Sequence, residues 1–274
     1  MVTPPLHLIL PEIAIGCLTM EGTFHRRKLP PPAIPFSSTE GKIIFQEALL
    51  SGGMQVYFPL AETFQTQGDP SFCGLGSLTT ALNAILLDPQ RVWRGVWRWW
   101  DESMLDCCES AEIVKLKGLS LTKVHCLARC QGAASTLHYA NASTEDEFRE
   151  AVQRSCQDES TSPTVIICSY SRSVMKQSGS GHFSPIGGYH AKKDLILIMD
   201  VARFKYAPHW VPLPLLFSAM NTIDSDDGVS RGWMTVQASQ ELNRRFSHGC
   251  CAALGHGNFT LQIPNAVTAA KQLK

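Results

Sequence analysis

Residues 64–88 read FQTQGDPSFCGLGSLTTALNAILLD, and this stretch decides the fold. It opens with polar and turn-forming residues and then passes through Cys73 into a helix pattern. The apolar positions recur at the three- and four-residue steps of one buried helical face: Leu75, Leu78, Leu82, Ile85 and Leu86. We expect Ser71 or Asp69 to cap this helix, with Pro70 at or just before its first turn.

Cys73 falls in the first turn of the expected helix. Unpaired backbone N–H groups and the positive end of the helix dipole favour a thiolate there, so the thiol would be placed to attack a carbonyl. Gln67, six residues earlier, can turn an amide N–H toward the oxyanion that such an attack creates. Taken alone, the stretch equally allows Cys73 to be a small buried core residue.

Composition narrows the class of protein. The 274 residues, 44% of them hydrophobic, suffice for a full core. The 24 basic and 24 acidic residues balance, which argues against nucleic acid and a membrane as partners. Ten thinly spread cysteines without an evident signal peptide favour a reducing, cytoplasmic compartment, although an organellar role for the N-terminal segment stays open. The longest apolar run, residues 195–199, is too short to span a bilayer.

Helix signals recur along the chain. Residues 37–40 can cap a helix that runs to about Leu50, with four residues directed inward: Ile43, Ile44, Ala48 and Leu49. Further helices are predicted over residues 110–117, 120–130 and 143–155. The four tryptophans of residues 93–100 favour core or cleft wall over a recognition platform. His125, Cys126 and Cys130 fit no tidy zinc spacing, which favours a structural role.

A hairpin is predicted in the second half of the chain. Residues 164–170 (TVIICSY) read as a buried strand, and residues 182–189 and 195–201 read as a strand pair. If the turn centres near residues 191 and 192, His182 comes opposite or nearly opposite Asp200. Taken singly, His182 would be an ordinary polar residue and Asp200 a turn residue. Together with Cys73 they match a nucleophile, base and orienting acid in the chain order of papain-like enzymes.

Four motifs resemble the catalytic domain of phytochelatin synthases: FQTQGDPSFCGLGSL, WRGVWRWWDESMLDCC, SGSGHFSPIGGY and LILIMDVARFKYAPHWVPL. The similarity extends from about Phe24 to about Val236. It implies an α+β, papain-like fold, in which a helical lobe carrying the cysteine helix packs on an antiparallel β-sheet lobe carrying His182 and Asp200. It also implies a catalytic domain over residues 23–238. Residues 1–22 are mildly apolar but interrupted by Pro11 and Glu12, and we expect them to be an extension that is cleaved or disordered. The short tail of residues 239–274 stands where the family has a large variable domain.

The resemblance implies a glutathione γ-glutamylcysteinyltransferase that serves heavy-metal detoxification. Cys73 would attack the Cys–Gly bond of glutathione, release glycine and hold γ-Glu-Cys as a thioester. The acyl group would pass to another glutathione, to a phytochelatin or to water. Acylation would need no cofactor, and heavy-metal ions (cadmium, zinc, copper) would act as activators through metal–glutathione thiolates. The implied partners are glutathione, phytochelatins and these ions, with a homodimer left open.

Site residues follow by matching positions. Cys73, His182 and Asp200 match the catalytic triad of the family, and Gln67 matches its oxyanion residue. The implied substrate-binding residues are Asp224 and Arg231 for the γ-glutamyl head group, Arg203, Lys205 and Tyr206 for the second glutathione, and Gly181. Without the resemblance, the charges at 224–231 and 203–205 would be interpreted as solvated loop residues.

Two other functions stay open. The same acyl-enzyme would make a glutathione hydrolase that releases glycine and γ-Glu-Cys with little polymer. A non-catalytic metal–thiolate binding protein would instead use the ten cysteines, although clustered CxC or CxxC pairs are missing from the sequence. Cys250 and Cys251 in the tail are weak candidates for a soft metal, and a loosely packed tail is the competing interpretation.

Overall fold

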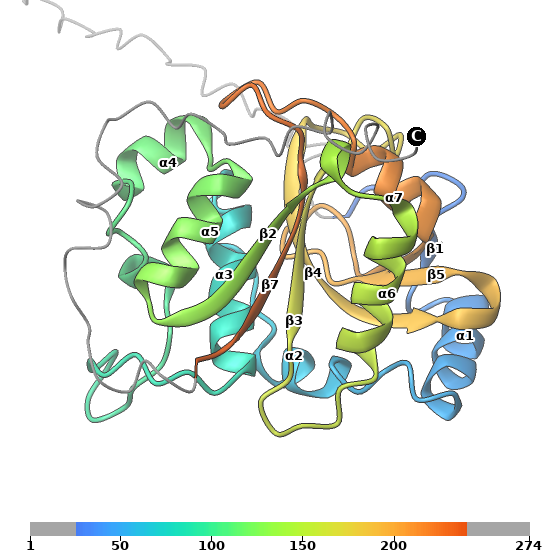
Figure 1. The fold of residues 1–274 in the computed structure, drawn as a ribbon, viewed down its shortest axis with the longest axis horizontal. Coiled ribbons are helices and arrows are strands. Elements are labelled where there is room, and N and C mark those ends of the chain that lie inside the picture. Colours follow the sequence, from blue (N-terminus) through green and yellow to red (C-terminus); the bar gives the residue numbers. More distant parts are fainter. Residues whose placement is uncertain (1–25, 240–274) are drawn as a thin grey trace, which may run out of the picture.

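The computed structural model describes residues 26–239. In that range seven strands form one antiparallel sheet in the order β1-β6-β5-β4-β3-β7-β2, and helices cover both of its faces (Figure 1). This mixture of helices and antiparallel sheet confirms the α+β class. The predicted N-terminal extension and the tail with Cys250 and Cys251 lie outside the described residues.

The elements have the following bounds. The strands are β1 (Ile34–Pro35), β2 (Ala133–Tyr139), β3 (Val165–Ser171), β4 (Gly181–His190), β5 (Leu195–Ile198), β6 (His209–Pro212) and β7 (Gly232–Ala238). The α-helices are α1 (Thr39–Leu50), α2 (Tyr57–Thr63), α3 (Cys73–Ala84), α4 (Ala111–Lys117), α5 (Leu121–Cys130), α6 (Glu145–Cys156) and α7 (Leu213–Met220). Short 3₁₀ turns are η1 (Glu102–Met104), η2 (Ala140–Ala142) and η3 (Ala191–Lys193).

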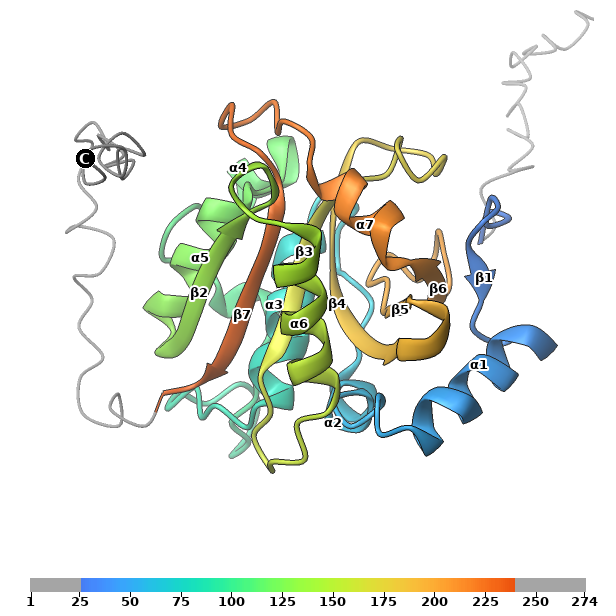
Figure 2. The same cartoon turned by 45° about the vertical axis from the view of Figure 1, so that its right-hand side comes forward.

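Helix α3 runs through the core, and every residue after Cys73 in it is buried. Figure 2 shows α3 on one face of strands β3 and β4 and α6 on the other. The helix begins at Cys73, as the sequence predicts, but its N-cap is Phe72. Asp69 instead closes the preceding turn, where its side chain accepts from the Ser71 N–H at 3.0 Å and its carbonyl from the Phe72 N–H at 2.9 Å. The prediction that Asp69 or Ser71 caps the helix is therefore wrong.

Helix α1 forms where the sequence predicts it, because the Ser38 hydroxyl caps it by accepting from the Gly41 N–H at 3.0 Å. Its buried stripe is narrower than expected. Ile44 is buried, but Ile43 and Leu49 are 47% and 38% exposed, which contradicts their predicted inward placement. Both side chains point about 100° away from the stripe that Ile44 and Ala48 share, because a helix turns by that angle per residue.

The tryptophan-rich segment departs from the prediction of a core or cleft wall. Trp100 is fully buried, and the Asn83 side chain bonds both its backbone N–H (2.9 Å) and its carbonyl (3.0 Å). Trp97 is 72% exposed, and Trp99 is also exposed. The segment is therefore attached to α3 by its last residue, and Trp93 also packs against the core, while the other two rings face solvent. Leu86, predicted on the buried face, is exposed too, since α3 ends at Ala84.

The predicted hairpin is present, but its second strand ends at Ile198, so Asp200 follows that strand and does not pair with His182 across it. Strands β4 and β5 pair antiparallel around η3, with a register shift between Ile186 and Gly188. On its other side β4 pairs with the fully buried strand β3, so that His182 lies opposite Tyr170. Within residues 26–239, no helix has the length and apolar character needed to cross a membrane.

Candidate active site

A pocket of about 380 Å³ opens where the N-terminus of α3 faces strands β3 and β4. Eight of its lining residues carry reactive or charged side chains: Cys73, Lys117, Arg172, His182, Lys205, Asp224, Asp226 and Arg231. A volume in this range suits a small-molecule ligand. Chain segments separated by more than 150 residues therefore meet at one cleft.

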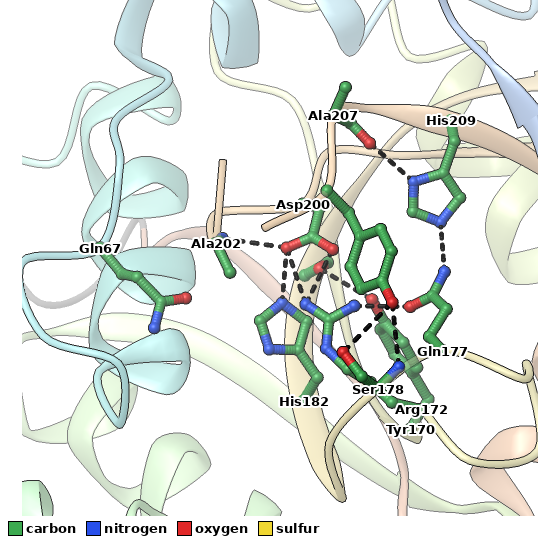
Figure 3. Close-up of polar contacts among 12 residues, drawn as sticks. Gln67, Tyr170, Arg172, Gln177, Ser178, His182, Asp200, Ala202, Ala207 and His209 are labelled. Carbon is green, nitrogen blue, oxygen red and sulfur yellow. Dashed lines mark hydrogen bonds and ion pairs between the residues drawn. The ribbon is translucent and has the colours of Figure 1, made fainter. Parts of the chain in front are cut away.

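His182 and Asp200 form a buried pair at the back of this pocket. His182 Nε2 lies 2.8 Å from Asp200 Oδ1, and the Ala202 N–H donates to the same oxygen at 2.9 Å (Figure 3). Burial lowers the pKa of His182 to about 4, so the imidazole is neutral near pH 7. Because a carboxylate only accepts, the ring proton lies on Nε2 and Nδ1 is left as an acceptor.

Asp200 stays ionised because its interactions with two neighbours outweigh its burial. Burial alone would raise the pKa of this carboxyl, but the hydrogen-bonded His182 and the Arg172 guanidinium hold it well below its usual range. Arg172 Nη2 donates to both carboxylate oxygens, at 3.0 and 2.8 Å. Sequence reasoning missed Arg172. The available signal was a charged residue directly after an entirely buried strand.

Arg172 is itself fixed by a chain of buried partners (Figure 3). Its Nη1 donates to Gln177 Oε1 at 2.5 Å, and Gln177 Nε2 lies 3.0 Å from His209 Nε2. His209 Nδ1 in turn lies 2.8 Å from the Ala207 carbonyl, which assigns the proton to Nδ1 and leaves Nε2 to accept from Gln177. The guanidinium also stacks on the Tyr206 ring, 5.1 Å from its centroid. The network thus holds the acid of the His–Asp pair in one orientation.

The electrostatics of Cys73 differ from the expectation. Burial raises the pKa of the thiol, although backbone groups of Phe183 and Gly74 and the charge of Arg172 act in the opposite direction. The helix terminus therefore does not make a resting thiolate, which corrects the prediction drawn from the dipole. The thiol needs a base to activate it.

Gln67 lies in the turn that leads to Cys73. Its Nε2 donates to the carbonyls of Asp69 and Pro70, at 2.8 and 2.9 Å, and its backbone N–H donates to Val201 at 3.0 Å. An oxyanion would compete with these carbonyls for the amide hydrogens. The Gln67 Oε1 atom is buried and makes no hydrogen bond within residues 26–239. The backbone bond ties this turn to the residue after Asp200.

Asp224 and Arg231 face each other across the pocket wall, and both are largely buried. Arg231 Nη2 lies 3.4 Å from Asp224 Oδ1, while Nη1 donates to the Ile223 carbonyl at 2.6 Å. Arg231 Nε is buried and has no hydrogen-bond partner in the part of the chain that is described. A Cβ on Gly181 would lie 3.2 Å from Arg231 Nη2, so glycine allows this close approach. The two residues are therefore pocket groups and not solvated loop charges.

The three residues predicted for the second substrate are placed differently. Lys205 lines the pocket, and burial together with the charge of Arg172 lowers its pKa. Arg203 stacks on Phe64, 4.9 Å from the ring centroid, and the buried Tyr206 hydroxyl accepts from the Ser178 N–H at 2.9 Å. Of the three, the described pocket lining includes Lys205 alone.

Glu102 is a second residue that sequence reasoning missed. Its carboxylate accepts the Gly68 N–H, with distances of 2.9 and 3.2 Å to its two oxygens, next to Gln67. Burial raises its pKa to about 7 despite that hydrogen bond, and the charges of Asp101 and Asp69 act in the same direction as burial. Nothing in the sequence distinguishes it from a surface acid.

Comparisons with known proteins agree with the motifs. A family model described as phytochelatin synthase matches residues 24–233. The chain is 54% identical over 213 residues to glutathione gamma-glutamylcysteinyltransferase 3 of Lotus japonicus, which covers 77% of this chain and 44% of that relative. It is 54% identical over 215 residues to glutathione gamma-glutamylcysteinyltransferase 1 of Arabidopsis thaliana, covering 78% and 44%. A relative from Schizosaccharomyces pombe is 40% identical over 239 residues, covering 86% and 56%. The chain spans about half the length of the curated relatives it matches.

Proposed function

The chain belongs to the phytochelatin synthase family, and we propose on that basis that it transfers γ-Glu-Cys from glutathione to an acceptor amine, with release of glycine. The observation that carries the proposal is a single pocket lined by Cys73, His182, Asp224 and Arg231. That pocket offers a nucleophile, a neutral base and a pair of opposite charges. We further propose that the fold is papain-like, with the cysteine at the start of α3 and its partners on and after the β4–β5 hairpin.

The proposed acylation step uses His182 as the base. As Cys73 Sγ attacks the carbonyl carbon of the Cys–Gly bond, His182 Nδ1 takes the thiol proton, and Asp200 stabilises the imidazolium. Collapse of the tetrahedral intermediate breaks the C–N bond, and the imidazolium gives its proton to the departing glycine nitrogen. The products are free glycine and a γ-Glu-Cys thioester on Cys73. Gln67 would supply an amide N–H to the oxyanion by leaving one of its two loop carbonyls.

The second step reverses the roles. The α-amine of the acceptor attacks the thioester carbon, His182 takes the amine proton, and the Cys73 sulfur leaves and is reprotonated. If water attacks in place of the amine, the product is free γ-Glu-Cys and the enzyme acts as a hydrolase. The same residues serve both outcomes, so the proportion depends on how well the acceptor is bound.

Asp224 and Arg231 suit the γ-glutamyl head group. That group carries an ammonium and a carboxylate on one carbon, and these two side chains place opposite charges 3.4 Å apart in the pocket. The buried Nε of Arg231 would donate to the substrate carboxylate. Because Gly181 has no side chain, the backbone of β4 can lie close to the Arg231 guanidinium.

Lys205 is our assignment for a carboxylate of the acceptor, because it lines the pocket beside Arg172. Arg203 and Tyr206 would act through their neighbours, Arg203 on Phe64 and Tyr206 under Arg172. Cadmium, zinc or copper ions would enter as thiolate complexes of glutathione and are in that sense part of the substrate. Since glutathione keeps the cytosol reduced, we place the reaction in the cytoplasm.

The test is product analysis with the purified full chain. Glutathione is incubated with and without cadmium, and the products are identified by mass spectrometry. Oligomers of γ-Glu-Cys ending in glycine, increasing with cadmium, are the expected result. Free glycine and γ-Glu-Cys without oligomers would make the chain a hydrolase, and a Cys73→Ser variant must abolish both. Unchanged glutathione in all reactions would overturn the catalytic proposal.

Substrate recognition has its own readout. Arg231→Lys keeps the charge but removes the Nε donor, so KM for glutathione should rise more than kcat falls. Arg154→Lys on α6, an exposed residue paired with Glu150, is the matched control and should change neither constant. An equal effect of both variants would contradict the assignment of Arg231.

A further inference from the structure

Four cysteines gather on the helical side of the molecule. Cys107 and Cys108 lie in the loop between η1 and α4, and Cys126 and Cys130 lie one turn apart on α5. Cys108 Sγ is 3.1 Å from the sulfur of Cys126 and 3.7 Å from those of Cys107 and Cys130. The sulfurs of Cys107, Cys108 and Cys130 all lie within 4.8 Å of one another. The expectation of unrelated structural cysteines at 126 and 130 did not anticipate this cluster.

The three sulfur separations measured from Cys108 are close to those of a tetrahedral metal site. With metal–sulfur bonds of about 2.3 Å, the edges of a regular four-sulfur tetrahedron measure about 3.8 Å. Two of these separations are 3.7 Å, and the third, 3.1 Å to Cys126, would have to open slightly. The Cys126 sulfur lies outside the set of three that are mutually within 4.8 Å, so it would also have to move toward Cys107 or Cys130 when an ion binds. Thiolate sulfur is the ligand that soft and borderline d¹⁰ ions prefer, and four of them in this geometry select zinc or cadmium.

The surroundings of the cluster suit thiolates. Gln131 Nε2 donates to Cys107 Sγ at 3.3 Å, and Gln131 is itself largely buried at the end of α5. Hydrogen bonds from outside the ligand set orient metal ligands and stabilise their charge. Cys107 is exposed while the other three are partly buried, which gives an ion one open approach to an otherwise enclosed set.

We propose that Cys107, Cys108, Cys126 and Cys130 bind one Zn²⁺ or Cd²⁺ ion as a four-thiolate site, and that the bound ion fixes α4 as a wall of the active-site pocket. This goes beyond the proposed transferase mechanism, whose acylation step is written without a protein-bound ion. Each cysteine would lose its proton on binding, so affinity rises with pH.

The second half of the proposal follows from the position of α4. The cysteine pairs flank this helix in the chain, so an ion bound to all four closes a loop that contains it. Lys117 and Gly118, at its C-terminal end, line the pocket, and the Ser71 hydroxyl donates to the Lys115 carbonyl at 2.9 Å. Ser71 is two residues from Cys73. Closing a loop with a metal removes conformational freedom from the segment inside it.

We call the ion, its four cysteines and the loop that they close the clamp, and helix α5 is its fixed side. It packs on α3 directly behind the nucleophile, where a Cβ on Gly74 would lie 2.9 Å from Val124 Cγ2. The pair Cys126 and Cys130 is therefore held by the core, whereas Cys107 and Cys108 belong to an irregular loop. Binding would thus order the loop and α4 against a surface that is already fixed.

The first experiment measures metal binding without turnover. The full chain is reduced, freed of metal and titrated with Cd²⁺, and bound cadmium and its X-ray absorption spectrum are measured. We expect one tightly held equivalent with four sulfur neighbours, retained in Cys250→Ser/Cys251→Ser and in Cys73→Ser. Cys108→Ser/Cys130→Ser should lose this equivalent while keeping its circular dichroism spectrum. Should that double variant unfold, Cys107→Ser, at the exposed ligand, should still weaken binding at least tenfold.

Four results would overturn the metal site. One is the same tight equivalent in the Cys108→Ser/Cys130→Ser variant. Another is an absorption spectrum dominated by oxygen or nitrogen neighbours. The third is loss of the equivalent in Cys250→Ser/Cys251→Ser, which would place binding in the tail. A disulfide between Cys108 and Cys126 in protein kept under reductant, detected by mass spectrometry, would also replace the metal proposal with a redox one.

The second experiment tests the coupling to the pocket. Hydrogen exchange of residues 109–119 is measured by mass spectrometry with and without Zn²⁺, and α6 serves as the internal control. Exchange over 109–119 should slow with zinc in the parent chain but not in Cys108→Ser/Cys130→Ser, and α6 should not change. Equal exchange with and without zinc over 109–119 would refute the clamp. Neither experiment uses glutathione, so their failure is distinct from failure of the transferase proposal.

Discussion

Arg172 holds both oxygens of the Asp200 carboxylate, at 3.0 and 2.8 Å, with side chains that are 3% and 0% exposed. The cation that keeps Asp200 ionised is therefore not the histidine that Asp200 orients. Because Arg172 remains charged at all working pH values, the carboxylate stays in place whether His182 is neutral or protonated. The acid is fixed before the base changes its charge.

Removing Arg172 should destabilise the protein strongly. Arg172→Met leaves a buried carboxylate without its permanent cation, for which a cost of about 3–5 kcal/mol is typical. Arg203→Met, which removes an arginine that stacks on Phe64, should cost about 1 kcal/mol or less. Urea unfolding of both variants at pH 7 measures the difference. Similar losses in the two variants would show that the ion pair contributes little.

The reactivity of Cys73 should show a resting thiol and not an ion pair. Burial raises the pKa of Cys73 and lowers that of His182 to about 4, so between pH 5 and pH 8 both groups are neutral. The rate of alkylation by iodoacetamide should therefore rise about tenfold per pH unit through this range, following the thiolate fraction. The rate is followed on the Cys73 peptide by mass spectrometry, and Cys73→Ser identifies the signal. A flat rate from pH 5 to pH 8 would instead indicate a thiolate–imidazolium pair.

Glu102 should make stability depend on pH in the neutral range. Its pKa is raised from 4.5 to about 7 in the fold, so the folded protein binds the proton more tightly than the unfolded chain. The contribution of the Glu102 proton to the free energy of unfolding is fully present below pH 4.5 and is lost as the pH rises through 7. Glu102→Gln should flatten this part of the profile while keeping an oxygen for the Gly68 N–H.

The measurement is the free energy of unfolding in urea at intervals from pH 4.5 to pH 8. Glu150→Gln on α6 replaces an exposed carboxyl and is the control, which should keep the slope of the parent protein. If Glu102→Gln has the same slope as the parent, another group is responsible for it.

Asn83 should be important for holding the tryptophan-rich segment. Its side chain makes two hydrogen bonds to the backbone of the buried Trp100, and Asn83→Ala leaves both backbone groups unpaired. A loss of about 1–3 kcal/mol is expected for each buried group left unsatisfied, reduced if water enters. Asn83→Asp keeps the acceptor but places a buried carboxylate oxygen against the Trp100 carbonyl, so at neutral pH its urea midpoint should fall at least as far as that of Asn83→Ala. A midpoint for Asn83→Ala within error of the parent would show that Trp100 is held by packing alone.

Local patterns predicted much of the fold. The helix that begins at Cys73, the capped helices α1 and α6 and the hairpin that brings His182 to Asp200 all depend on residues near one another in the chain. The pKa of Cys73 could not be predicted in this way, because the helix dipole is a local property whereas burial depends on the whole fold. For the same reason the exposed side of α1 was misassigned, since only the packed structure shows how wide its contact surface is.

Contacts between residues far apart in the chain could not be predicted from the sequence. Arg172 became part of the site through a contact across 28 residues, and Glu102 through one across 34. The cysteine cluster joins a loop to a helix, and its spacing matches no linear metal pattern. The charges of Asp224 and Arg231 could be assigned through the family motif, but their burial against the pocket depends on where β7 enters the sheet.

That entry point also sets the timing of assembly during synthesis. Strand β7 is the last strand described, yet it lies between β3 and β2, pairing with both along its length. A nascent chain that has left the ribosome only as far as α7 already contains the nucleophile and the His–Asp pair, but it has two open strand edges and lacks Arg231. The cleft is therefore completed in one late step, and a chain whose synthesis ends before Ala238 has exposed strand edges that favour aggregation or degradation.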